Sequence, residues 1–206
     1  MPKIIKEACV ETKEQLDNAL SHHADQIELC SRLDIGGCAP TDELTQYALS
    51  KSDHILIMIR NRADYSTSWF NCWKLRSIIK KYQATNVQGF VFGFLKNNQI
   101  DVKTVKSFMK LIQNKEAVFH MAFDELIDWK NAIDMLVSLG VTRILTKGGK
   151  SSPATNNIEH LNEIKLYANN RIQIIVGGSV TDENCQKIAL ATGIEYFHGR
   201  KLAFQN

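Results

Sequence analysis

The sequence has little of several features that would assign it to a special class of protein. Only 3 of its 206 residues are proline and 11 are glycine, whereas 44% are hydrophobic. Disordered chains show the opposite balance, because they carry too few apolar residues to form a core. No stretch reaches the roughly 18 apolar residues that a membrane span requires. Charged residues interrupt the apolar run at the N-terminus, so we do not interpret it as a signal peptide. We therefore expect a folded cytoplasmic protein without a membrane partner.

A strong surplus of charge of one sign is also missing. The 25 Lys and Arg residues stand against 22 Asp and Glu residues, which gives a net charge of +3. Basic side chains are spread along the chain and form only short pairs such as Lys80-Lys81. Nucleic-acid-binding proteins usually carry a basic stripe or cluster. We expect no nucleic acid partner.

The cysteine pattern lacks a CxxC pair, and the number of cysteines is odd. The five are Cys9, Cys30, Cys38, Cys72 and Cys185. In a chain without a secretory signal, such cysteines are typically reduced thiols of a cytosolic protein. Cys72 and Cys185 fall within expected helices, where packing in the core is the ordinary role of a free cysteine.

Short β-like runs alternate with amphipathic helical segments along the whole chain. We expect strands at 4–9, 26–30, 54–60, 89–95, 117–123, 143–146, 172–176 and 195–198. We expect helices at 12–22, 41–50, 68–82, 101–113, 128–139, 158–169 and 181–191. Alternation of this kind implies crossover units and a parallel sheet.

Eight strands without a linker predict one α/β domain over residues 1–206, a (β/α)₈ TIM barrel. The alternative is an open doubly wound sheet, which usually carries fewer strands. Only a few residues follow the last strand, so we expect the eighth helix to be shortened or missing. An open sheet edge there would favour a subunit partner, and hence a homo-oligomer of two or more copies.

In such barrels the chemistry lies at the C-terminal ends of the strands. The first strand ends with Glu7 and Cys9, and the second with Glu28 and Cys30. Because strand side chains alternate, each Glu shares a face with its Cys, and the two thiols are expected close together at the rim. Two adjacent thiolates suit a soft metal such as Cu(I), although both could instead be packed core thiols.

Charged side chains at the other strand ends could serve catalysis. Arg60 would point into the barrel mouth, to pair with the two glutamates or to bind an anion. His120 and Asp124 share a face by alternation, which suits a general base with its orienting carboxylate, or a metal ligand. The candidate catalytic residues are Glu7, Glu28, Arg60, His120 and Asp124.

The loops after the last strands predict an anion site. Gly177, Gly178 and His198 lie where TIM barrels commonly hold a phosphate. Lys147 follows the sixth strand and could form a Schiff base if it were desolvated. Cys38 lies in the loop after the second strand, within reach of the thiol pair, and is a candidate third thiol.

Together these strand ends resemble the CutC copper-homeostasis family over nearly the whole chain. The matching segments are 27–30, 36–41, 58–62, 119–124, 143–146 and 177–180, followed by Asn184. The resemblance implies a TIM barrel, a cytoplasmic location and a role in copper handling. It also implies that Cys9 and Cys30 are the Cu(I) ligands.

The chain departs from the family pattern at three places. The family's Arg-Pro-Arg-Gly-Gly-Asp-Phe is one residue shorter here and runs from Arg60 to Tyr65. Met121 stands in place of an arginine, and Cys38 in place of a threonine. These changes reshape the loop after the third strand, remove a cation and add a thiol.

Three functions are therefore open. The first is a cytoplasmic protein that binds copper(I) for buffering or trafficking. The second is a barrel enzyme acting on a small anionic or phosphorylated substrate. The third is a catalytically silent barrel whose rim serves a protein partner, which an exposed apolar patch at the shortened end would favour.

Overall fold

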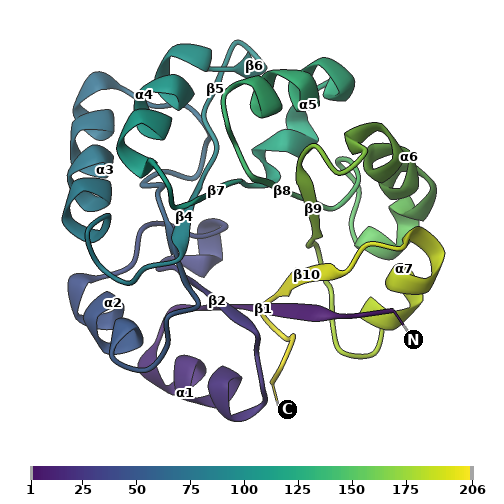
Figure 1. The fold of residues 1–206 in the computed structure, drawn as a ribbon, viewed down its shortest axis with the longest axis horizontal. Coiled ribbons are helices and arrows are strands. Elements are labelled where there is room, and N and C mark those ends of the chain that lie inside the picture. The colour runs from purple at the N-terminus through teal and green to yellow at the C-terminus, as the bar shows by residue number, and fades with distance from the viewer. Residues whose placement is uncertain (1, 205–206) are drawn as a thin grey trace.

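The computed structural model describes residues 2–204, and its centre is a closed parallel barrel. Figure 1 looks along the barrel, with the strands at the centre and the helices around them. The strand order is β1-β10-β9-β8-β7-β4-β3-β2. Their bounds are β1 (Ile5–Val10), β2 (Gln26–Leu29), β3 (Ile55–Met58), β4 (Gly89–Phe92), β7 (Glu116–Phe119), β8 (Arg143–Thr146), β9 (Gln173–Val176) and β10 (Tyr196–Gly199). The TIM barrel predicted from the alternating pattern is confirmed.

Helices cover the outside of the barrel, and most begin at a polar capping residue. They are α1 (Lys13–Ser21), α2 (Asp42–Leu49), α3 (Trp69–Tyr82), α4 (Val102–Ile112), α5 (Trp129–Ser138), α6 (Ile158–Ala168) and α7 (Cys185–Thr192). The side chains of Thr12, Thr41 and Ser68 each accept a hydrogen bond from a backbone amide of the first turn. Such caps stabilise a helix start because these amides have no partner within the helix.

The barrel closes without an eighth helix. After β10, residues 200–204 contain no helix, as the sequence predicts. Parallel pairing of β1 with β10 closes the sheet, for example at Ile5 with Tyr196. The expected open edge is therefore absent from the described strands, so it gives no support to a subunit partner. Phe204 packs instead against the cluster of Ala8, Val10 and Leu16 on the outer side of β1.

Three of the expected boundaries differ from the structure by three or four residues. The strand expected to reach residue 95 ends at Phe92, and a hairpin of β5 (Leu95–Lys96) and β6 (Gln99–Ile100) follows. Its turn is formed by Asn97 and Asn98, both with positive φ, a conformation that asparagine tolerates well. The strand expected at 117–123 ends at Phe119, and the helix expected at 181–191 begins only at Cys185.

The core has two layers, as alternation along the strands requires. Outward-facing side chains such as Phe90, Phe92 and Phe119 pack beneath the helices. Inward-facing residues fill the barrel, and these include Cys9, Cys30, Leu56, Met58, Val91, Val118, Leu145 and Ile175. The two cysteines are thus part of the barrel interior and not of the outer layer.

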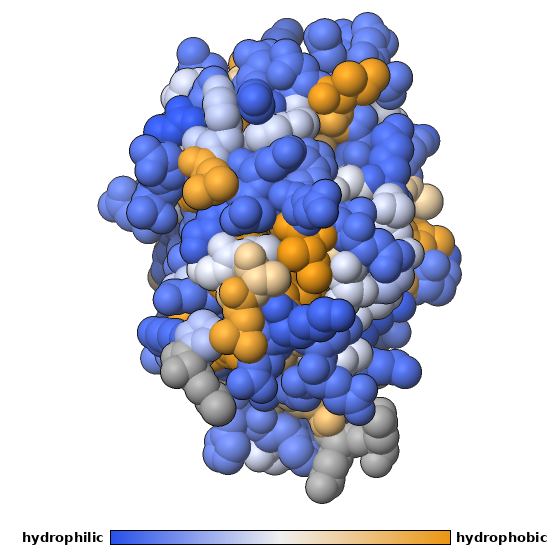
Figure 2. Space-filling view, turned by 90° about the vertical axis from the view of Figure 1, so that its right-hand side faces the viewer, coloured by the Kyte–Doolittle hydropathy of each residue, from blue (hydrophilic) through white to orange (hydrophobic). Residues whose placement is uncertain are grey.

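The outer surface is largely hydrophilic on the side that carries α6 and α7. Figure 2 shows that hydrophobic residues there form small patches among hydrophilic ones. Leu166 on α6 and Leu190 on α7 are among the exposed hydrophobic residues. Among the described helices, none is both long and apolar enough to cross a membrane.

Candidate functional site

A cavity of about 700 Å³ opens at the C-terminal ends of the strands. Side chains from β1, β2, β3, β8 and β10 form its wall, together with the loops that follow β2, β3, β7, β9 and β10. Seven of the predicted site residues line it, namely Cys9, Glu28, Cys30, Arg60, His120, Gly178 and His198. Glu7, Asp124, Gly177, Lys147 and Cys38 are not among the lining residues. The structure therefore brings seven of the twelve candidates together around one cavity and leaves the other five outside its lining.

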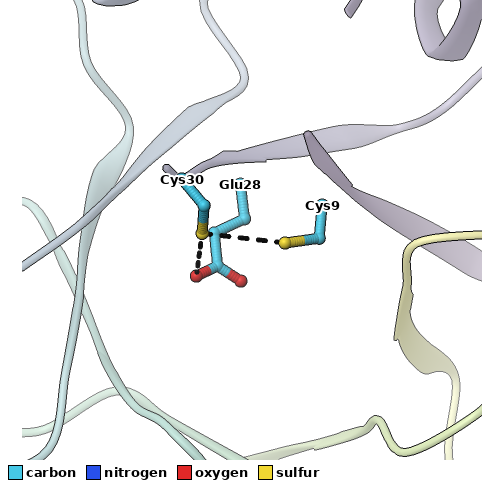
Figure 3. A group of neighbouring side chains, drawn as sticks. All are labelled: Cys9, Glu28 and Cys30. Atoms are coloured by element: carbon cyan, nitrogen blue, oxygen red, sulfur yellow. Dashed lines mark hydrogen bonds between the residues drawn. The ribbon is translucent and has the colours of Figure 1, made fainter. Parts of the chain in front are cut away.

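The two thiols meet on one wall of this cavity. The Sγ atoms of Cys9 and Cys30 lie 3.6 Å apart, and Cys30 Sγ lies 3.4 Å from Glu28 Oε1. Figure 3 shows the three side chains pointing toward one another from adjacent strands. The cause is the register of β1 and β2, which places Cys9 beside Glu28 and directs both into the barrel. The expected rim pair is therefore present.

A histidine from the last strand connects the two glutamates beneath this pair. His198 Nδ1 lies 2.8 Å from Glu7 Oε1 and 3.2 Å from Glu28 Oε2. All three side chains are buried. The sequence placed His198 with an anion site, but in the structure its partners are the protein's own carboxylates.

These contacts shift the pKa values of the thiols in opposite directions. Cys30, and after it His198, lower the pKa of Cys9 to about 6, although burial acts to raise it. Cys30 has its pKa raised well above the usual value by Cys9 and by burial. One thiol of the pair is thus ionised at neutral pH while the other keeps its proton.

The acid and base beside the thiols are shifted as well. Burial raises the pKa of Glu28 to about 8, and the negative charge of Cys9 adds to this effect. Burial opposes protonation of His198, but Glu28, Cys9 and Glu7 together raise its pKa well above the usual value. The favoured state at neutral pH therefore contains a Cys9 thiolate beside a protonated His198.

A buried arginine that the sequence analysis missed completes the interior. Arg143 donates to Gln26 Oε1 at 2.7 Å and to Glu116 Oε1 at 3.0 Å. Its Nη1 also lies 3.9 Å from Glu7 Oε2, and its guanidinium lies over the ring of Tyr196. Its position at the start of β8, with its side chain directed into the barrel, could have revealed it, because a buried charge needs a partner.

Arg60 follows β3, the neighbour of β2 in the barrel, and does not pair with the glutamates. Its Nη1 donates to the carbonyl oxygens of Gly36 at 2.9 Å and Gly37 at 3.2 Å, and its Nη2 donates to Ala63 O. The guanidinium lies 5.1 Å from the ring centre of Tyr65. Backbone carbonyl groups of the loops therefore accept the hydrogen bonds of Arg60. The two glutamates, which were one of its two expected partners, do not.

Among the described residues His120 and Asp124 form no hydrogen bond or ion pair with each other, contrary to the sequence expectation. The chain leaves the strand at Phe119 and forms a short 3-10 helix, Met121–Glu125, so strand alternation no longer applies. His120 Nδ1 accepts a hydrogen bond from the Ala122 amide. Asp124 instead accepts from Thr146 and from two backbone amides of the loop after β8.

The glycine loop after β9 reaches the cavity only in part. Gly178 and Ser179 both have positive φ and line the cavity. The amide of Gly177 is already bonded to Thr146 O, and that of Thr181 to the side chain of Asn184. Because α7 begins at Cys185, the loop is not the start of a helix, which weakens the expected anion site at Gly177 and Gly178.

Two groups of side chains have donor atoms close enough to hold a metal ion. One is Cys9, Glu28 and Cys30, and the other is Glu7, Glu28 and His198. Two sulfurs each about 2.3 Å from a metal can lie up to about 4.6 Å apart, so the 3.6 Å separation fits a shared ion. Cys38 belongs to neither group.

Proteins of known family resemble this chain over nearly its whole length. A model of the CutC family matches residues 4–203. A CutC family protein of Streptococcus pyogenes is 34% identical over 208 residues, which cover 97% of this chain and 100% of that protein. A CutC family protein of Enterococcus faecalis is 32% identical with the same coverage.

Solved structures agree with these relatives. The crystal structure of a copper homeostasis protein CutC from Streptococcus agalactiae is 35% identical, with a TM-score of 0.90, and the match covers 96% of this chain and 99% of that one. An aldolase, QR15, reaches a TM-score of 0.71 at 13% identity over 97% of this chain and 92% of its own, which supports the barrel fold alone. The chain belongs to the CutC family.

Proposed function

We propose that this protein binds Cu(I) through Cys9 and Cys30 and serves to buffer or deliver copper in the cytoplasm. The observation that carries the proposal is the pair of sulfurs 3.6 Å apart on the wall of an open cavity. Thiolate is a soft ligand and favours Cu(I) over hard cations. The crystal structure of the Streptococcus agalactiae relative is described as that of a copper homeostasis protein, which supports the same reading.

The electrostatics of the pair favour binding at neutral pH. A thiol must lose its proton to become a metal ligand, so metal affinity depends on pH. With a pKa of about 6, Cys9 is already ionised, and only Cys30 must give up a proton. Glu28 is close enough to Cys30 to serve as a weaker third ligand once it has lost its own proton, since its pKa is about 8.

Titration of reduced protein with Cu(I), against a competing chelator, tests this proposal. We expect the variant Cys9→Ser/Cys30→Ser to lose affinity by more than the roughly 10–100-fold that changes outside the ligand set typically cause. The matched control is Cys72→Ser/Cys185→Ser, which removes two thiols on helices α3 and α7. An unchanged Cu(I) affinity in the first variant would show that Cys9 and Cys30 are not the copper ligands.

Oligomeric state belongs to the same proposal. We expect a homo-oligomer, although the closed barrel removes the open-edge argument for it. The exposed side chains of Trp69, Phe70 and Trp73 at the start of α3 form the aromatic cluster to examine first. Sedimentation of the protein and of Trp69→Ser/Trp73→Ser tests it, since a monomer in both cases would contradict the expectation.

A further inference from the structure

The cavity is larger than a metal ion requires. Its volume of about 700 Å³ falls within the roughly 300–1,000 Å³ of small-molecule sites. The two thiols occupy only the wall formed by β1 and β2. Another part of the wall carries Arg60, Tyr65 and His120, and no role in binding copper falls to these three residues.

Arg60 on this wall is a buried cation without a carboxylate partner. The residue is 7% exposed, and no carboxylate of residues 2–204 lies within 4.0 Å of its guanidinium nitrogens. Its hydrogen bonds go to three backbone carbonyl groups, and its Nε has no partner. Burial of a charge is costly unless an opposite charge accompanies it. The protein itself supplies none here.

His120 adds a fixed hydrogen-bond donor beside this cation. Its Nδ1 accepts from the Ala122 amide at 3.1 Å, so in the neutral ring the proton must lie on Nε2. Nε2 is buried and has no partner, although the residue lines the cavity. Burial, and then the charge of Arg60, lower the pKa of His120 to about 3, so the ring stays neutral and cannot take over as a cation.

The neighbours hold this donor in place. The ring of Tyr65 lies near both groups, with its centre 5.3 Å from the His120 ring centre and 5.1 Å from Arg60 Cζ. Behind His120, a Cβ atom on Gly93 would lie only 2.3 Å from Cε1. The imidazole therefore packs directly on the glycine backbone and has no room to turn away from the cavity.

We propose that this wall binds the oxyanion of a small organic molecule, with Arg60 supplying the positive charge and the Nε2–H group of His120 a hydrogen bond. A buried polar atom without a partner is costly, and a ligand oxygen relieves that cost at His120. The same oxygen, or a second oxygen of the same oxyanion, supplies the negative charge that the buried Arg60 lacks. Carboxylates and phosphates share this chemistry, and both fit a cavity of this volume.

Three compounds with one carbon skeleton separate the sources of the anion. Glycerate carries a carboxylate, glycerol 3-phosphate a phosphate, and glycerol no charge. Metal-free, reduced protein is titrated with each while the melting temperature and the His120 Nε2–H signal in proton–nitrogen NMR spectra are followed. We expect one of the two anions to raise the melting temperature and move this signal, and glycerol to do neither.

Variants of His120 then test the hydrogen-bond donor. His120→Phe, which keeps an aromatic ring beside Tyr65, should weaken binding of the active anion at least about tenfold, because a hydrogen bond to a charged group is lost. His120→Gln retains an N–H donor and should recover part of the loss. His160→Phe is the matched control, since His160 lies on α6 and contacts Gly148 O outside the cavity wall.

The outcome is independent of the copper proposal. Cys9→Ser/Cys30→Ser should lose Cu(I) but keep anion binding within about twofold, because no hydrogen bond among residues 2–204 joins the two thiols to Arg60 or His120. Failure of both anions to shift the melting temperature or the His120 signal at millimolar concentration would overturn this inference. Equal shifts with glycerol would overturn it too, because the site would then not select a charge.

Discussion

His198 Nδ1 lies 2.8 Å from Glu7 Oε1 inside the barrel. The contact joins the last strand to the first, across the pairing that closes the sheet. It orients the imidazole toward Glu28 and the Cys9 thiol, which are the groups that raise its pKa. The ionisation of the thiol pair therefore depends on a residue far from both cysteines in the sequence.

The first prediction concerns this dependence. His198→Gln should raise the pKa of Cys9 from about 6 toward its usual 9.0, because a positive charge and a hydrogen bond are lost. The rate of alkylation of Cys9 by iodoacetamide, followed by peptide mass spectrometry from pH 5 to 9, gives this pKa. His160→Gln serves as the control. The same midpoint in both variants would show that His198 does not act on the thiol.

The second prediction concerns stability in acid. Because its folded pKa of about 3 lies below the unfolded 6.5, His120 binds more protons when the chain is unfolded, so its contribution to the free energy of unfolding falls as pH drops below 6.5. Well below pH 6.5 the slope approaches about 1.4 kcal/mol per pH unit.

Other groups act with the opposite sign in this range, so the measurement must be a difference. The raised pKa values of Glu28 and Asp124 let both carboxyls take up protons on folding, which favours the folded state as pH falls. Urea unfolding of the protein and of His120→Gln from pH 4 to 8 isolates the histidine. A difference between the two proteins that stays constant with pH would contradict a buried neutral ring.

The third prediction concerns the interior arginine. Arg143→Met removes the partner of Glu116 and Gln26 and a cation 3.9 Å from Glu7 Oε2, and should lower the free energy of unfolding by about 3–5 kcal/mol. Denaturant unfolding measures this change. Arg171→Met is the control, since Arg171 pairs with Asp134 at the exposed surface, where solvent screens an ion pair and its removal should change the stability far less. Equal losses would mean that burial does not set the cost.

The fourth prediction concerns the packing of His120 on Gly93. Gly93→Ala should destabilise the protein by about 1–3 kcal/mol, because the new methyl group overlaps the imidazole. If the overlap is the cause, Gly93→Ala should cost much less in a chain that already carries His120→Ala. A double-mutant cycle measured by urea unfolding checks this. If the two substitutions changed the free energy of unfolding additively, the overlap with His120 would not be the cause of the destabilisation.

The strand ends were predictable where the chain stays regular. Alternation along β1 and β2 correctly put Cys9, Glu28 and Cys30 on one wall, because register and side-chain direction follow from the strand itself. The closed barrel followed from the number of strand and helix units. These properties are local or additive, so a single sequence contains them.

The remaining site depends on how loops return to the barrel. Alternation failed at His120 and Asp124 because the backbone turns into a 3-10 helix at Met121. For Arg60 alternation correctly predicted a position in the barrel mouth, but it could not predict that the carbonyl groups of Gly36 and Gly37, on another loop, accept hydrogen bonds from the guanidinium. Tyr65 and Arg143 were missed, and only the three-dimensional arrangement shows what each of them contacts.

Pairing of the first strand with the last also sets an order of events during synthesis of the chain. Cys9 and Cys30 are separated by 21 positions and come together as soon as β2 joins β1. His198 is separated from Glu7 by 191 positions, so it arrives only when nearly the whole chain has left the ribosome. A nascent chain thus holds both cysteines before it holds His198, one of the groups that lower the pKa of Cys9, and this ionisation is complete only in the finished barrel.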